Sequence, residues 1–469
     1  MLKTLSIFLG LTCFVNAQNN WDLKSCIDYA VQHNIQLKQS QISSEINKNN
    51  YEQTKFGTLP TLNLGAAHTY NFGKTIDRFT NTFANTQVLS QNFFVSSNVV
   101  LFSGFSQYNN IKANEYNYLS TAENVRQQQN DLTLNLVNFY LNVIFTSELT
   151  GIAKNQYNIT KEQLERTQKL VDAGSLAKSV QYDIEAQLAN EEVNVTTAEN
   201  NYQLAMLSLK QLMNLDSVNS FNIVRPNIDV EGQPILNMSV QSIYEIALKN
   251  QPNIKSSEYS LISSERSLAA ARGRRSPTIS ANGSLGTGTS GLDKRIDAVN
   301  YVGLEQAPYY TQSGEAIYGP KTEIITSPKP FADQFKDNVN KSFGFTISVP
   351  LFNGLQTHTG VKNARLTVLN SKLNQDLTKQ NLYKNIAQAY TSAQAALSKY
   401  MANKKSVEAS DASFKFAEQK FNVGAISAFD YNTAKNRLIN AQSNLLQSKY
   451  EYILRLKVLD FYQGKDMTL

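Results

Sequence analysis

The chain has 469 residues, of which 41% are hydrophobic and 10% aromatic, a composition that excludes intrinsic disorder and allows two or more domains. The formal net charge of +6 comes from scattered Lys and Arg, so it does not favour nucleic-acid binding. No run after the N-terminal segment reaches the ~18 apolar residues of a membrane-spanning helix. Transmembrane strands are not excluded, because each needs only about ten alternating residues.

The first 17 residues have the pattern of a cleavable secretory signal peptide. Lys3 supplies a positive charge, residues 5–15 form an apolar core, and residues 15–17 are a small-residue cleavage site. We therefore expect the mature chain to begin near Gln18. A lipid anchor on Cys13 is the alternative, although the residues before it are a poor lipidation context.

Cys26 is then the one cysteine of the mature chain. A single cysteine cannot form an intramolecular disulfide, so the fold must depend on packing. We expect Cys26 to serve as a small apolar residue on a helix face.

The first half of the chain changes from helical to strand periodicity and back. The pattern predicts a helix over residues 23–55, which ends before Pro60. Apolar residues then alternate over 62–72 and again over 95–101, which predicts two strands. We therefore expect a β-hairpin over residues 60–103.

A very long helical hairpin follows. Residues 104–171 contain no proline, and their apolar residues recur mostly at spacings of three, four or seven. Such a helix would be about 100 Å long, far more than a globular core requires. The chain then turns at Gly174 and returns through a predicted helix over 179–213. The helical hairpin as a whole spans 104–213.

The second half repeats the first. Matching residues lie 217 positions apart early in each half and 250 positions apart later. They include Ala30 with Ala247, Leu37 with Ile254, Leu101 to Gly104 with Leu351 to Gly354, Tyr140 with Tyr390, and Gly174 with Gly424. The second half has therefore gained 33 residues. An internal repeat of this kind organises the whole chain.

The repeat sets the expected domains. A first repeat spans 18–230 and a second spans 231–469, with strands expected over 279–285 and 343–351 in a β-hairpin at 277–352, and a helical hairpin at 354–461. The extra residues fall at 286–341, which are rich in Gly, Pro, Tyr and polar residues. This composition predicts a long loop.

Four amphipathic strands per chain cannot span a bilayer alone, because lipid does not tolerate an open sheet edge. Three chains would supply twelve strands. The expected fold is therefore an α+β membrane protein with a shared trimeric twelve-stranded β-barrel, which continues into a long barrel of coiled-coil helices. A non-conducting periplasmic coiled-coil scaffold is the alternative, but a scaffold has no need of lipid-facing strands.

The motifs together resemble the TolC family of bacterial outer-membrane efflux proteins across essentially all of the mature chain. They are the opening segment from Trp21 to Leu37, its echo from Ala247 to Ile254, the two Leu-Phe-x-Gly junctions, and the two Gly-centred turns. The resemblance implies a homotrimer in the bacterial outer membrane that extends into the periplasm. It also implies recruitment by a periplasmic adaptor protein and an inner-membrane transporter, as the exit duct of an efflux pump or a type I secretion system.

The resemblance also implies two kinds of site. The Gly-centred turns would be the tips that dock against the adaptor, and they comprise Ala173, Gly174, Ser175, Val423, Gly424 and Ala425. A glycine at each turn would equally serve as a plain helix cap. Acidic residues narrow the pore in this family. Asp430 stands at the matching place, and Asp183 is the candidate in the first half, although Asp430 would look the same as a first-turn helix acid. Thr433 departs from the family's second acid.

Other chemistry is not supported. Residues 286–291 match a dinucleotide-binding fingerprint, but no crossover helix follows them. The three histidines, His33, His68 and His358, have no partner at metal-ligand spacing. We expect no catalytic residues, no cofactor and no metal, so the chain is not predicted to be an enzyme.

A cluster of three arginines ends the helix before Pro277, and it comprises Arg272, Arg274 and Arg275. Cations there complement the helix dipole. Contact with lipid headgroups of the outer membrane is the alternative.

Overall fold

The computed structural model describes residues 20–85, 87–215, 221–226, 238–465 and 467. The expected signal peptide lies outside the described residues. The chain divides into two compact units. We call residues 1–48, 116–262 and 369–469, as far as they are described, the helical unit, and residues 49–115 and 263–368 the sheet unit. Each unit takes segments from both halves of the sequence.

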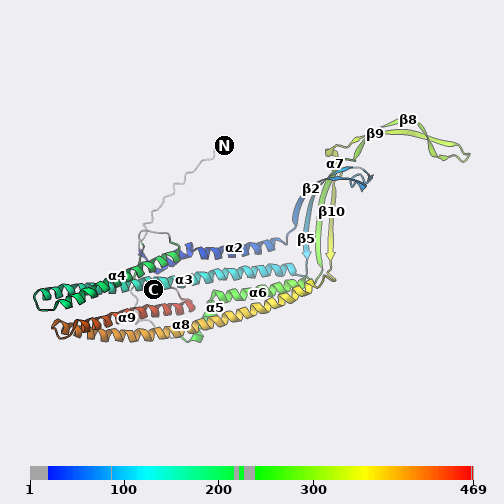
Figure 1. Ribbon diagram of the computed structural model, residues 1–469. Coiled ribbons are helices and arrows are strands. Elements are labelled where there is room, and N and C mark those ends of the chain that lie inside the picture. Colours follow the sequence, from blue (N-terminus) through cyan, green and yellow to red (C-terminus); the bar gives the residue numbers. More distant parts are fainter. Residues whose placement is uncertain (1–19, 86, 216–220, 227–237, 466, 468–469) are drawn as a thin grey trace, which may run out of the picture. The chain divides into compact units, whose positions relative to one another are not determined.

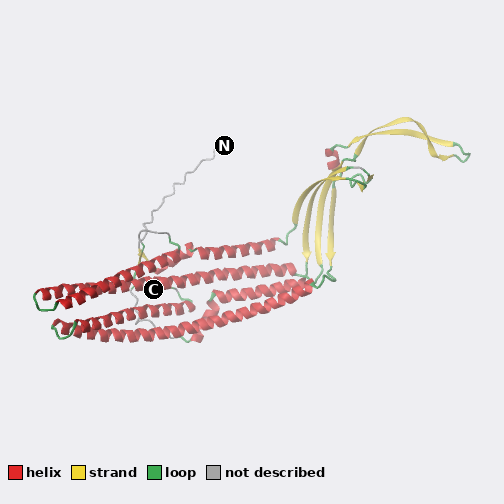
Figure 2. Cartoon of the chain, viewed as in Figure 1, coloured by secondary structure: helices red, strands yellow, loops and turns green. Residues whose placement is uncertain are grey.

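Helices of matching length make up the two halves (Figure 1, Figure 2). Those of the first half are α1 (Leu23–His33), α2 (Ile35–Phe56), α3 (Ser106–Asp172) and α4 (Lys178–Met213). Those of the second half are α5 (Val240–Asn250), α6 (Pro252–Gly273), α8 (Gln356–Asn422) and α9 (Ala428–Tyr462). Both long helices, α3 and α8, have 67 residues. At ~1.5 Å per residue each is about 100 Å long.

The helix expected over 23–55 is in fact two helices, α1 and α2, and this corrects the prediction. Asn34 leaves the helical conformation, and its side-chain oxygen accepts a hydrogen bond from the Leu37 backbone N–H at 3.0 Å. Its amide also donates to the Leu212 carbonyl at 3.0 Å. Asn34 therefore ends α1 and caps α2, a local competition that apolar periodicity does not reveal. The second half breaks at the matching residue, Gln251, before Pro252.

The core of the helical unit lies along the middle of α3. Leu136, Val137, Tyr140 and Ile144 are almost fully buried there, against α1 and the end of α4. The matching part of α8 carries a smaller cluster that includes Ile386. An 18-residue stretch of α3 has a mean hydropathy of 1.2, enough for a membrane span by length and composition, but 44% of it is buried inside the chain. Its apolar residues are therefore used in helix packing.

The sheet unit contains an antiparallel sheet with the strand order β10-β7-β5-β2. Its strands are β2 (Thr61–Asn71), β5 (Val88–Phe102), β7 (Thr278–Ser290) and β10 (Asn340–Ser348). Each half contributes one hairpin, and the β5–β7 pairing joins the halves. These are the four strands that the alternating pattern predicted. Within the described residues the edge strands β2 and β10 have a strand partner on one side only.

The register places apolar and polar residues on opposite faces of this sheet. Partners across strands share a face, and one face carries Leu64 opposite Val95, Val95 opposite Leu285, and Ile279 opposite Ile347. The other face carries Asn63, Ser96, Ser284 and Ser342, of which the two last lie with their hydroxyls 2.7 Å apart. The apolar side chains of β2 and β10 are exposed in the chain on its own.

Residues 286–341 are not the irregular loop that composition predicted. They contain the end of β7, then β8 (Lys294–Tyr310), β9 (Ala316–Pro328) and the short helix α7 (Phe331–Asp337). β8 and β9 pair with each other in a two-stranded antiparallel sheet, which we call the ribbon (Figure 2). Register shifts interrupt β8 at Asp297, at Val302 and between Gln306 and Tyr310, and so hide the period of two from a reading of the sequence.

Short pairings complete the described structure. β1 (Asn20–Trp21) pairs in parallel with β6 (Asn222–Ile223). β3 (Thr75–Ile76) pairs with β4 (Phe83–Ala84) in the connection between β2 and β5.

Candidate functional site

The turn between α3 and α4 is closed by a backbone motif that requires glycine. The Ser175 N–H donates to the Leu170 carbonyl at 2.8 Å, and the Gly174 N–H donates to the Val171 carbonyl at 2.9 Å. This pair of bonds is a Schellman cap. Gly174 has φ +75°, a left-handed conformation that residues with a Cβ disfavour. The glycine thus has a structural role whether or not the turn also docks a partner.

The turn between α8 and α9 has the same geometry. Gly424 has φ +74°, and the Ala425 N–H donates to the Lys420 carbonyl at 2.8 Å. A Cβ added to Gly174 or Gly424 would meet no heavy atom within 4 Å. Conformation, not crowding, therefore accounts for both glycines.

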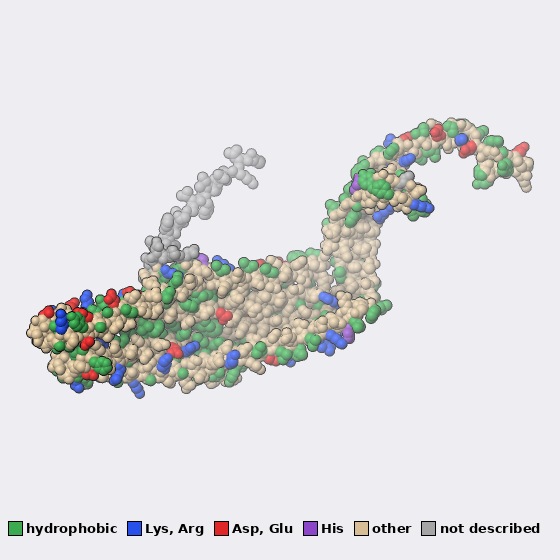
Figure 3. All heavy atoms as spheres, in the orientation of Figure 1, with side chains coloured by type: hydrophobic (Ala, Val, Ile, Leu, Met, Phe, Trp, Pro, Cys, Tyr) green, Lys and Arg blue, Asp and Glu red, His purple; other side chains and the backbone are tan. Residues whose placement is uncertain are grey.

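The two turns lie together at one end of the helical unit (Figure 1). The Arg166 guanidinium donates to the Asn422 side-chain oxygen at 2.9 Å and so connects α3 to the end of α8. Val423 and Phe429, beside the second turn, are each 79% exposed. At this end of the helical unit, apolar side chains and side chains of both charges lie next to one another on the surface (Figure 3). Exposed apolar residues within a polar rim are typical of a protein-binding surface.

Asp430 lies in the first turn of α9, where it takes part in the helix cap. The Ser427 side-chain oxygen accepts from the Asp430 N–H at 3.1 Å, and the Ser427 hydroxyl donates to the Asp430 carboxylate at 2.7 Å. Both side chains are exposed. Asp183 is exposed on α4, in its second turn. Asp430 and Asp183 thus lie near the two turns, on different helices.

Sequence reasoning missed a buried ion pair between the halves. Lys435 of α9 and Glu191 of α4 have side chains that are 2% and 4% exposed, and their charged atoms are 3.2 Å apart. Lys435 also donates to the Thr160 hydroxyl of α3, and that hydroxyl donates to Glu191. Gln187 donates a further hydrogen bond to Glu191 at 2.9 Å.

Burial lowers the pKa of Lys435, and the nearby Glu191 carboxylate works against that shift. A signal for this site exists in the sequence. Lys435 lies at helical spacing between Tyr431 and Leu438, both of which are buried. A charge within an apolar stripe predicts a buried partner, although the stripe does not say which residue that partner is.

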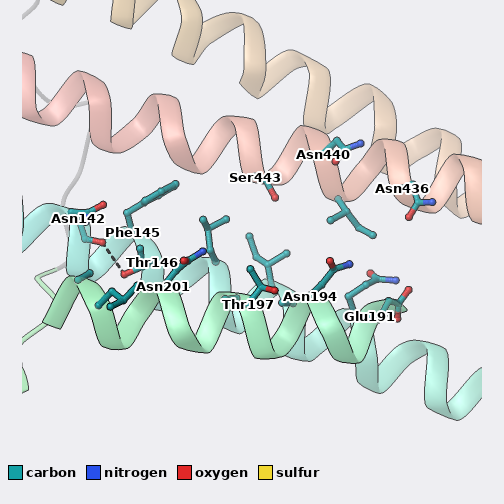
Figure 4. Close-up of a pocket in the computed structure, with 18 of the residues that line it drawn as sticks. Asn142, Phe145, Thr146, Glu191, Asn194, Thr197, Asn201, Asn436, Asn440 and Ser443 are labelled. Atoms are coloured by element: carbon teal, nitrogen blue, oxygen red, sulfur yellow. Dashed lines mark hydrogen bonds between the residues drawn. The ribbon is translucent and has the colours of Figure 1, made fainter. Parts of the chain in front are cut away.

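A groove of about 760 Å³ runs beside this ion pair, between α3, α4 and α9 (Figure 4). Its walls carry neutral polar side chains, and those labelled in Figure 4 include Asn142, Thr146, Asn194, Thr197, Asn201, Asn436, Asn440 and Ser443. Its apolar lining residues include Phe145, Leu149 and Ile439. Glu191 is the only ionisable side chain among the residues that line the groove. The groove is therefore polar but nearly neutral.

The residues singled out for other chemistry have local structural explanations. Residues 286–290 belong to β7, and a Cβ on Gly288 would lie 2.2 Å from the Gln91 carbonyl oxygen, so close strand packing accounts for that glycine. His33 stacks on Tyr29, and His68 contacts the Gln91 amide at 3.0 Å. In the part of the chain that the structure describes, no group of three or more His, Cys, Asp or Glu side chains could hold a metal ion.

Known proteins share this architecture. The chain is 21% identical to outer membrane protein TolC of Escherichia coli K12 over 97% of this chain and 85% of the relative. It is 19% identical to outer membrane efflux protein BepC of Brucella suis, over 77% of this chain and 69% of the relative. The structure is similar to the CmeC outer membrane channel of Campylobacter jejuni, with a TM-score of 0.76 and 16% identity over 96% of this chain and 87% of that chain.

The outer membrane protein VceC of Vibrio cholerae is also similar, with a TM-score of 0.73 and 14% identity over 94% of this chain and 96% of that chain. The chain therefore shares its fold with solved outer-membrane proteins, including the CmeC channel. The profile of the family described as outer membrane efflux protein matches residues 26–215 and 243–465. The chain therefore belongs to the outer membrane efflux protein family.

Proposed function

We propose that this protein is the outer-membrane exit duct of an efflux pump or a type I secretion system, a passive trimeric channel across the outer membrane and the periplasm. The four-stranded sheet is the main observation that supports this proposal. It has one apolar face, one face of Ser and Asn, and two open edges. Lipid requires closed edges and an apolar outer face, whereas a pore requires a polar inner face. Three copies joined edge to edge meet all three requirements.

The lining of the helical unit supports passive conduction. The polar side chains of the groove beside α3, α4 and α9 are nearly all neutral amides and hydroxyls, which hydrogen-bond to water and to many solutes without holding them tightly. A conduit must bind its cargo weakly enough to release it. The energy for transport would then come from partner proteins.

The lipid of the outer membrane is also a proposed partner of this protein. The exposed apolar residues of the edge strands, among them Leu64 and Phe343, would contact acyl chains. Arg274 and Arg275 are exposed after the end of α6, where they would lie near headgroups if that end faces the periplasmic rim.

The two Gly-centred turns are the proposed docking site of a periplasmic adaptor, which links the duct to an inner-membrane transporter. Val423 and Phe429 support this role, because water-exposed apolar side chains at a helix turn gain free energy when a partner covers them. Residues 173–175 would dock in the same way at the first turn.

Asp430 is the proposed acidic constriction, and Asp183 is the candidate on α4, one turn after Val180, the residue that matches Asp430 in the first half. Three copies of Asp430 around one axis would place like charges close together and would favour cations. Ser427 holds the carboxylate in a defined position, which a selectivity ring needs.

Single-channel conductance in a planar bilayer, with the subunit number from native mass spectrometry, tests the duct. We expect trimers with a small, fluctuating conductance that rises when Asp430→Ala is introduced. Asp411→Ala is the matched control, because Asp411 is an exposed acid on α8 paired only locally with Lys415. Monomers that extract without detergent and conduct nothing would reject the duct and favour the periplasmic scaffold.

A photo-reactive residue at position 423 tests the docking site, and one at Lys405, exposed on α8, is its control. We expect position 423 to cross-link in intact cells to a periplasmic adaptor with a helical hairpin. Equal yields of the adaptor from both positions would contradict a docking site at the turns.

A further inference from the structure

We propose that the ribbon formed by β8 and β9 is an assembly element, whose apolar face packs against the ribbons of the other two copies in the trimer. The proposal rests on the trimeric channel proposed above, and it concerns the 33 residues that distinguish the second half from the first.

The ribbon has two unlike faces. Cross-strand partners share a face, so Val299 lies beside Ile324, and Leu304 lies beside Pro320. The apolar residues of one face are Ile296, Val299, Tyr301, Leu304, Tyr310, Tyr318, Pro320 and Ile324, and all except Pro320 are large hydrophobic side chains that are more than half exposed. The same face also carries the polar residues Lys294, Gln306, Thr322 and Thr326. The opposite face comprises Arg295, Ala298, Asn300, Glu305, Lys321, Glu323 and Ile325. This face carries side chains of both charges, so it is compatible with exposure to water.

Two of the three register shifts in β8 fall between Ile296 and Leu304 and create this separation. Ile296, Val299, Tyr301 and Leu304 are spaced by three, two and three residues, so strict alternation would place them on both faces. The extra residues at Asp297 and Val302 move the following residues back to the same face. The shifts thus keep most of the large paired residues of the ribbon on one side, with Ile325 on the other, which indicates a role for the apolar side.

The base of the ribbon is firmly attached to the barrel sheet. The Gln334 side chain accepts from the Ser290 N–H at 2.8 Å and donates to the Lys329 carbonyl at 2.9 Å. The Lys329 ammonium lies 2.8 Å from Asp337 and 3.9 Å from Asp293. The ribbon therefore leaves the sheet from a defined root, whereas its apolar face is without a covering element among the described residues.

A two-stranded hairpin is marginally stable in water by itself, and an apolar face of this size calls for a cover. Lipid does not fit, because both ribbon edges are open and the opposite face is charged. A second copy does fit. α7 and then the edge strand β10 follow the ribbon directly, and β10 is the strand that joins the next copy in a shared barrel.

The shared barrel thus holds three ribbon roots around one axis, at a high effective concentration. Three ribbons with their apolar faces turned inward bury those faces mutually and leave the charged faces in water. The three-fold symmetry closes this contact, so it cannot grow into a filament.

Cysteine cross-linking tests the proposal on the full chain, in a Cys13→Ser background. Cys26 is the remaining native thiol, and it does not interfere because it is fully buried and burial raises the pKa of its thiol to about 12. Ile324→Cys places a thiol on the apolar face, and Glu323→Cys places one on the charged face at the neighbouring position of the same strand. Both native side chains are exposed, so neither variant should disturb folding.

A trimaleimide reagent should convert Ile324→Cys into a covalent trimer at least tenfold more efficiently than Glu323→Cys, at a yield independent of dilution. Equal yields in the two variants, or none in a preparation that mass spectrometry shows to be trimeric, would overturn the ribbon contact and leave the channel intact. Cross-linking of Ile324→Cys in cells to a different protein, but not to itself, would likewise overturn it. Failure to form trimers at all would instead reject the proposed duct.

Discussion

The two halves of the chain fold alike in their helices and differ in what they add. α3 and α8 each have 67 residues, and α4 and α9 have 36 and 35. Both halves break their first helical segment at matching positions, Asn34 and Gln251. Because local periodicity and the glycine-centred turns are alike in the two halves, the same elements form twice.

The two halves differ in the residues that contact other parts of the chain. Lys435 and Glu191 join the halves, but their counterparts 250 positions away are Glu185 and Ala441, so the ion pair occurs once. The ribbon likewise belongs to the second half alone. A duplicated sequence thus repeats its backbone and diverges at its contacts.

The largest expected effect comes from breaking the ion pair between the halves. Lys435→Ala would leave the Glu191 carboxylate buried without its counter-ion, which typically costs about 3–5 kcal/mol. Thermal unfolding of the purified protein, followed by circular dichroism, measures the loss. Glu185→Ala is the matched control, because Glu185 is exposed, and we expect a loss below about 0.5 kcal/mol. Similar losses for the two variants would mean that the ion pair does not stabilise the fold.

The double variant Lys435→Met with Glu191→Leu tests whether the uncompensated buried charge causes the loss of stability. It removes both charges and fills much of their volume, so it should recover most of the stability that Lys435→Ala loses. Thermal unfolding compares the double variant with Lys435→Ala. No recovery of stability in the double variant would mean that the loss in Lys435→Ala does not come from an uncompensated buried charge.

Replacing Asn34 should have the next largest effect on stability, because its side chain has two roles. Asn34→Ala loses the cap of α2 and the bond to the Leu212 carbonyl, for which we expect a cost of about 1–2 kcal/mol. Asn34→Ser retains a capping oxygen but does not reach Leu212, so about half of that cost should remain. Denaturant titration compares the two variants. Equal losses would assign the whole effect to the bond with Leu212.

The two tip glycines should respond equally. Gly174→Ala and Gly424→Ala each force a Cβ into a left-handed backbone conformation, which costs roughly 1 kcal/mol, and there is no steric clash to add. Asn at either position should cost less, because it tolerates that conformation. Unfolding temperatures of the four variants test this. A clearly larger loss at one turn would indicate contacts there beyond the cap.

The helix caps after the turns should give the smallest effects, with opposite signs. Ser427 caps α9, whereas Ala177 at the start of α4 makes no side-chain cap. Ser427→Ala should lose about 1 kcal/mol, and Ala177→Ser should gain a few tenths to ~1 kcal/mol. The measurements are the unfolding midpoint of each variant and its helix content at that midpoint. Loss of stability in Ala177→Ser would show that another group already occupies the capping site.

Most of the helical architecture could be predicted because helix periodicity is a local property. The ends of α3, α4, α8 and α9 fall within about two residues of the predicted ones. The break at Asn34 and the strands of the ribbon escaped prediction. In the first case a side chain competes with the helix for backbone hydrogen bonds, and in the second two bulges disrupt the alternation.

The sequence by itself determined the repeat, the four strands of the barrel sheet, the long helices and the two glycine turns, because apolar period and turn chemistry are written in neighbouring residues. The tertiary structure alone decided which strands pair between the halves, which lysine is buried, and which face of the ribbon is apolar. Each of these depends on residues far apart in the chain, such as Lys435 with Glu191 and Val95 with Leu285, whose approach no local pattern encodes.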